Sequence, residues 1–131
     1  MIKSPARFYT AFSGIFLLIQ GTSTLAFRLY PPLDRAFPQL LAVTQMIPPH
    51  SILHITTGVL ALLILWKGGE QGAFLFALGF GAFYTGLAIY GFVTHEHTMF
   101  GLQPFDHPFH LFLGLWGLVV AVWVYFQKRK K

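Results

Sequence analysis

Charged residues are scarce in this chain of 131 amino acids. Only 10% of the residues are charged, whereas 55% are hydrophobic, and an average soluble domain has roughly a quarter charged residues. A soluble domain of this length needs more polar groups than this to cover its surface. The composition therefore excludes an ordinary soluble globular domain and indicates an integral membrane protein.

Cysteine is absent, which excludes disulfides and thiolate ligands, so any metal site must use histidine or carboxylate ligands. The chain also lacks a recognisable nucleophile motif, phosphate-binding loop or dinucleotide fingerprint. Nothing in the sequence therefore argues for an enzyme. The basic tail, Lys128–Lys131, is typical of a membrane-surface anchor, and we expect no nucleic-acid partner.

Four apolar runs are long enough to approach the roughly 20 residues that a membrane-spanning helix needs. They predict an all-α fold, a single four-helix membrane bundle over residues 1–131, with helices at about 8–30, 50–67, 72–93 and 107–127. The first run is longer than the core of a signal peptide, about 7–15 residues, and Gln20 interrupts it, which favours a retained helix.

The connection between the first two spans, residues 30–49, holds five of the eight prolines. It is too long for a tight turn and too apolar for a solvated linker. We expect its centre, residues 37–46, to form a short interfacial helix. Its apolar side chains would face lipid or the bundle: Phe37, Leu40, Leu41 and Met46.

Basic residues predict the orientation, because they are retained on the cytoplasmic side. Seven lie before the first span, between the second and third, or after the fourth: Lys3, Arg7, Lys67 and Lys128–Lys131. The other side has only Arg28 and Arg35. We therefore expect a multi-pass protein of the cell inner (plasma) membrane with both termini cytoplasmic.

Two segments form a weak internal repeat. "HSILHITTGVLALL" and "DHPFHLFLGLWGLV" each read polar-x-x-x-His-x-x-x-Gly before an apolar run. The aligned pairs are His50 with Asp106, His54 with His110, and Gly58 with Gly114. The pattern predicts two weakly repeated helix pairs that enter the membrane in the same direction.

On these motifs, "PPHSILHITTG" (Pro48–Gly58) and "FDHPFHLFLG" (Phe105–Gly114), the chain resembles the bacterial membrane family catalogued as domain of unknown function 4383. The resemblance implies a four-helix fold and supplies no activity.

With both termini inside, all six histidines fall on the outer side of the membrane. The simplest interpretation is that Asp106 caps the fourth helix and that His50 and His54 lie at headgroup depth, bonded to water, lipid phosphate or a loop carbonyl. No cofactor is needed in that case. The protein is then a non-catalytic accessory or binding protein of the lipid bilayer, alone, as a homo-oligomer or in a larger membrane complex.

A second hypothesis is a metal site. His50 and His54 are four residues apart and share a helix face, and Asp106 and His110 repeat that spacing. Together, these four residues would form a three-histidine, one-carboxylate site open to the outer surface. Such ligands suit zinc, copper, iron or nickel.

A third hypothesis concerns His54 with Gly58 and His110 with Gly114, because each glycine lies one turn beyond its histidine. The recess that a glycine leaves can receive a tetrapyrrole such as haem or chlorophyll, whose metal the histidine ligates, or a closely packed helix. A further stripe of small residues, Ala77, Gly81 and Thr85, predicts a packing face on the third helix.

Overall fold

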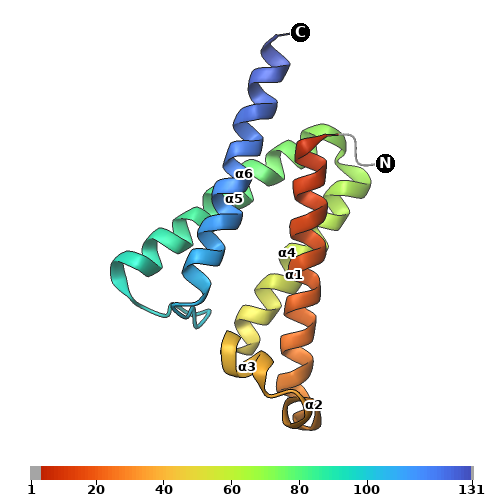
Figure 1. Cartoon of the computed structure of the whole chain (residues 1–131). Helices are drawn as coiled ribbons and strands as arrows, with labels where there is room; N and C mark the ends of the chain where they lie inside the picture. The colour runs from red at the N-terminus through yellow and green to blue at the C-terminus, as the bar shows by residue number, and fades with distance from the viewer. Residues whose placement is uncertain (1–3, 131) are drawn as a thin grey trace.

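The computed structural model describes residues 4–130, and all of its regular structure is helical (Figure 1). Four long helices, α1 (Pro5–Leu29), α4 (Pro48–Lys67), α5 (Gly69–Thr94) and α6 (Asp106–Arg129), are each long and apolar enough to cross a membrane. The expected all-α membrane fold is confirmed. The structure begins and ends these helices within three residues of the expected positions.

Local sequence explains where the helices begin and turn. The Ser4 hydroxyl accepts a hydrogen bond from the Arg7 amide at 3.2 Å, and Pro5 follows as the first helical residue of α1, a position that suits proline. Pro48 and Pro49 likewise occupy the first helical positions of α4, although no side chain caps that helix. Between α4 and α5, Gly69 has a φ of +59°, a left-handed conformation that glycine adopts without steric cost.

The connection at residues 30–49 differs from the single interfacial helix that we expected. It contains two short helices, α2 (Pro31–Ala36) and α3 (Gln39–Thr44). The prolines at the start of α2 explain the extra turn, because proline is pre-organised for a first helical position. Leu41 and Met46 are buried, whereas Phe37 is exposed.

The long helices pack as two hairpins, α1 with α4 and α5 with α6. Glycines lie where the helices of each hairpin approach most closely. A Cβ atom on Gly58 would lie 2.8 Å from the carbonyl oxygen of Gly14, and one on Gly114 would lie 3.0 Å from that of Gly81. Backbones this close leave no room for a side chain, which is the usual reason for small residues between membrane helices.

The predicted stripe on α5 does face α6. Gly81 lies against Gly114 and Leu118, Thr85 contacts Gly114, and the Ala77 carbonyl lies beside Gly117. The Tyr9 hydroxyl joins the two hairpins, because it donates a hydrogen bond of 2.7 Å to the Leu113 carbonyl.

The start of α1 and the end of α6 lie at one end of the bundle, whereas α2, α3 and the α5–α6 connection lie at the other (Figure 1). We call the second end the histidine end, because the starts of α4 and α6 and the end of α5 lie there. The outer faces of the helices expose large apolar side chains such as Ile19, Trp66, Val93 and Val119. Such faces fit a lipid bilayer, in which apolar side chains contact hydrocarbon.

Candidate metal centre

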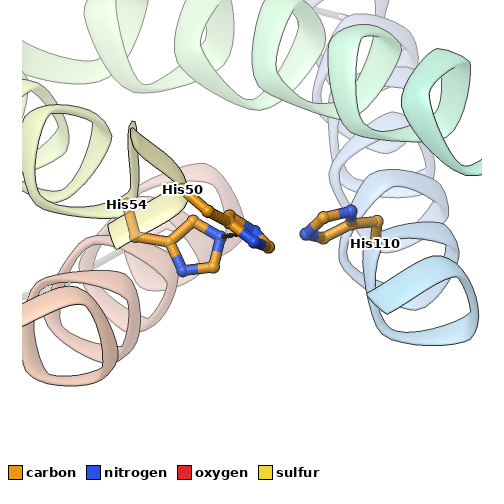
Figure 2. A group of neighbouring side chains, drawn as sticks. All are labelled: His50, His54 and His110. Atoms are coloured by element: carbon orange, nitrogen blue, oxygen red, sulfur yellow. Dashed lines mark hydrogen bonds between the residues drawn. The ribbon is translucent and has the colours of Figure 1, made fainter. Parts of the chain in front are cut away.

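Three histidines converge at the histidine end, between the two hairpins. His50 and His54 lie in the first turns of α4, and His110 lies in the first turns of α6. Figure 2 shows the two α4 imidazoles extending toward the His110 ring from the opposite side. Their exposed fractions are 0%, 1% and 0%. The simplest interpretation expected His50 and His54 to contact lipid headgroups. In the structure, protein encloses both side chains instead.

The ring nitrogens lie close enough to share one ion. The Nε2 atoms of His50 and His54 share a hydrogen bond of 3.1 Å, and one nitrogen from each of the three rings lies within 4.8 Å of the other two. The His110 ring centroid is 5.7 Å from that of His50 and 6.0 Å from that of His54. The predicted histidine ligands are thus brought together from two helices far apart in the sequence.

Most nitrogens of this cluster have no hydrogen-bond partner. The Nδ1 atoms of His50 and His54 and both ring nitrogens of His110 are buried and unpartnered. An unsatisfied buried polar group typically costs about 1–3 kcal/mol, so such groups call for a specific explanation. A bound cation fits this set of atoms, because a neutral imidazole offers it a lone pair.

Asp106 lies at the edge of the cluster rather than at a helix cap. Its Oδ2 atom is 3.9 Å from Nδ1 of His50 and accepts a hydrogen bond of 2.7 Å from the backbone amide of Gln103. The residue that precedes α6 is Phe105, and it makes no side-chain cap. The prediction that Asp106 caps the fourth helix is therefore wrong, and its carboxylate turns toward His50.

Tyr84 closes the α5 side of the cluster. Its ring meets that of His110 edge to face, with centroids 4.7 Å apart, and the side chain is fully buried. The sequence analysis did not select this residue for the site. A signal was present, because Ala77, Gly81, Tyr84, Ala88 and Gly91 recur at the spacing of one helix face, and all are buried.

The connections at the histidine end pack against one another. Met46 and Leu102 are fully buried at the histidine end. A Cβ atom on Gly101 would lie 2.7 Å from the Ile47 side chain, so the segment before α4 touches the α5–α6 connection. The sequence analysis expected the four candidate ligands to be open to the outer surface, but in the structure the three histidine rings are buried.

The space beside the two repeat glycines is occupied by protein. Gly58 packs against Gly14 and Leu18 of α1, and Gly114 packs against Gly81 and Thr85 of α5. The tetrapyrrole hypothesis with His54, His110, Gly58 and Gly114 requires that space for a flat ring. The geometry favours the alternative, close helix packing.

The other three histidines lie outside the cluster. His95 and His97 are exposed after the end of α5, and Nδ1 of His97 donates to the Leu102 carbonyl at 2.6 Å. His107 is buried against Gly91 and the ring of Phe92. None of the three belongs to the group whose nitrogens lie within reach of one ion.

Comparison with known proteins identifies a family. Neither the curated proteins nor the solved structures contain a significant match to this chain. The sequence profile of the family described as "Domain of unknown function (DUF4383)" matches residues 7–124, a stretch that includes α4, α5, most of α1 and α6, and the histidine cluster. The chain therefore belongs to the DUF4383 family.

Proposed function

We propose that this protein is a non-catalytic, metal-binding protein of the membrane, and that His50, His54 and His110 hold one transition-metal ion. The observation that carries the proposal is the convergence of three buried imidazoles, whose nitrogens lie within 4.8 Å of one another. Two of them come from one hairpin and the third from the other. An ion at this place would cross-link the two halves of the bundle.

The distances suit a small ion after modest adjustment. Two nitrogens bound to tetrahedral zinc at about 2.0–2.1 Å are roughly 3.3 Å apart, and the Nε2 atoms of His50 and His54 are 3.1 Å apart. The nitrogen of His110, which lies within 4.8 Å of the other two, has to approach them by up to about 1.5 Å for full coordination. Imidazole ligands are typical of zinc, copper, iron and nickel.

The enclosure of the site supports a binding role. Catalytic metal centres keep one position open to water or substrate, whereas none of the three rings is more than 1% exposed. A covered site of this kind holds its ion for structure or storage. Reaction of that ion with an external substrate would need the histidine end to open first.

The repeat and the orientation complete the proposal. The contact of Gly14 with Gly58 in the first hairpin resembles that of Gly81 with Gly114 in the second, which supports two repeated helix pairs. The unequal distribution of basic residues supports cytoplasmic termini. In that orientation, the metal site lies near the outer surface of the inner membrane.

Metal analysis of purified protein tests the proposal. Full-length protein, purified in detergent with a tag that contains no histidine, should hold about one equivalent of metal per chain after zinc loading and removal of excess metal. His54→Ala and His110→Ala should each abolish stoichiometric binding, because two protein ligands rarely retain an ion. His95→Ala is the matched control, because it removes an exposed histidine at the same end.

The absorbance spectrum of the same samples checks the tetrapyrrole alternative. Wild-type protein that carries no metal, and takes up neither zinc, copper, iron nor nickel when titrated, would refute the metal site. A visible band of a bound tetrapyrrole that disappears in His54→Ala would favour the alternative.

A further inference from the structure

The two nitrogens of His50 face different partners. Its Nε2 atom points toward His54, at 3.1 Å from Nε2 of that ring. Its Nδ1 atom lies on the other edge of the ring, 3.9 Å from the Asp106 carboxylate. The side chains of His50 and Asp106 are 0% and 4% exposed, so the contact between them is shielded from bulk solvent.

The carboxylate is held in place by its own helix start. The Gln103 amide donates to Oδ2 of Asp106 at 2.7 Å, and the Asp106 amide donates to the Gln103 carbonyl at 2.9 Å. These paired bonds fix Asp106 at the beginning of α6, opposite the beginning of α4. Of the four acidic residues in the chain, only Asp106 is buried.

On the basis of the metal site proposed above, we infer that Asp106 is a positioning residue that orients His50 through Nδ1–H and makes the site selective for a divalent ion. Histidine ligands commonly donate their second ring N–H to a carboxylate, which fixes the tautomer and strengthens the metal bond. With Nδ1 protonated, the lone pair of His50 is on Nε2, the atom that already faces His54.

The distance between Asp106 and His50 indicates an indirect role for the carboxylate in metal binding. At 3.9 Å, Asp106 and His50 are about 1 Å beyond a hydrogen bond, so the contact closes when His50 turns slightly to bind the ion. Asp106 is therefore an outer partner of His50 rather than the fourth ligand that the sequence suggested. Its charge still acts on the ion through a dry interior, where electrostatic interactions are stronger than in water.

The charge of Asp106 distinguishes ion classes. Three neutral imidazoles contribute no net charge, so the interaction of Asp106 with the bound ion scales with the charge of that ion. A divalent ion gains twice the free energy that a monovalent ion gains at the same position. Monovalent copper also prefers the soft sulfur of cysteine or methionine, and the cluster has only nitrogen donors. The arrangement thus fits a divalent first-row ion.

Asp106→Asn tests this inference, because it keeps the size of the side chain and removes the charge. Competition with a chromophoric chelator, using full-length protein in detergent, should show a loss of Zn²⁺ affinity of about 10–100-fold, as is typical for such outer partners. Under anaerobic conditions, Cu⁺ affinity should fall by only about 3–10-fold. The ion has half the charge and so loses half the interaction free energy, which is the square root of the factor for Zn²⁺.

Two controls separate a specific effect from a general one. Glu96→Gln removes a carboxylate on the exposed connection after α5, and should leave both affinities within about 2-fold, since an exposed charge is screened by water. Asp106→Glu restores the charge, and should bind Zn²⁺ more tightly than Asp106→Asn does.

A spectroscopic measurement on the wild-type protein tests the same inference without relying on the folding of a variant. In zinc-loaded protein with ¹⁵N-labelled histidine, NMR should show His50 protonated at Nδ1 and bound to metal through Nε2. Binding through Nδ1 would overturn the inference, as would wild-type Zn²⁺ affinity in Asp106→Asn. Both results would leave the three-histidine site standing, whereas a wild-type protein that binds no metal would refute the site itself.

Discussion

The close approach of α5 and α6 at Gly114 makes a quantitative prediction about stability. In Gly114→Ala, the new Cβ atom would lie 3.0 Å from the Gly81 carbonyl oxygen and 2.5 Å from the Thr85 amide nitrogen. Both atoms belong to the backbone of α5, so no side-chain rotation relieves the contact. The two helices must therefore separate.

The cost follows from two opposing terms. Overpacking of this kind costs about 1–3 kcal/mol, and the higher helix propensity of alanine recovers up to about 1 kcal/mol. We expect a net destabilisation of about 1–2 kcal/mol for Gly114→Ala. For a chain of this size, the thermal midpoint should fall by roughly 4 °C or more.

Gly86→Ala provides the matched control. A Cβ atom on Gly86 of α5 meets nothing within 4 Å, so only the propensity gain applies and the thermal midpoint should be unchanged or slightly raised. The assay is thermal unfolding of both variants in the same detergent, followed by circular dichroism and size-exclusion chromatography. Equal midpoints for the two variants would refute the close approach of α5 and α6 at Gly114.

Three further predictions concern the link between hairpins, the pH dependence and the orientation. Tyr9→Phe removes the hydrogen bond to the Leu113 carbonyl, and should lower the free energy of unfolding by about 1 kcal/mol in a denaturation assay. Zinc bound at the histidines should be released on acidification, because a protonated imidazole has no lone pair for the ion; zinc that stays bound in strong acid would contradict imidazole ligation. Met99→Cys, at a position that is 80% exposed, should react with an impermeant thiol reagent from outside intact cells, whereas reaction only after lysis would reverse the orientation.

The fold was largely predictable because hydropathy determines it directly. A run of apolar residues of membrane length becomes a helix, since lipid offers no partners to an unpaired backbone. The contacts of the α5 stripe were predictable for a related reason, because small residues at four-residue spacing mark close approach. Proline was harder to interpret: Pro31 begins α2, although a cluster of prolines also fits an irregular loop.

The proximity of the candidate site residues was predictable from the sequence, but their environment was not. The repeat paired His54 with His110 and His50 with Asp106, and these residues do meet. The burial of the histidines could not be predicted from the same pattern, because it depends on packing between the two hairpins, such as that of the Tyr84 ring against His110. The role of Asp106 was misjudged for the same reason, since a carboxylate before an apolar run looks like a helix cap until its neighbours are known.

The position of the site relative to the hairpins has an energetic consequence. Glycine contacts hold α1 to α4 and α5 to α6, but the histidines lie between the hairpins rather than within one. An ion that binds only the closed bundle stabilises it by mass action, by about 2.7 kcal/mol when the free ion is at 100 times its dissociation constant. The ion would stabilise the contact between the hairpins, which is less extensive than the contact between the two helices within each hairpin. Metal binding should therefore stabilise the association of the two hairpins more than the helices themselves.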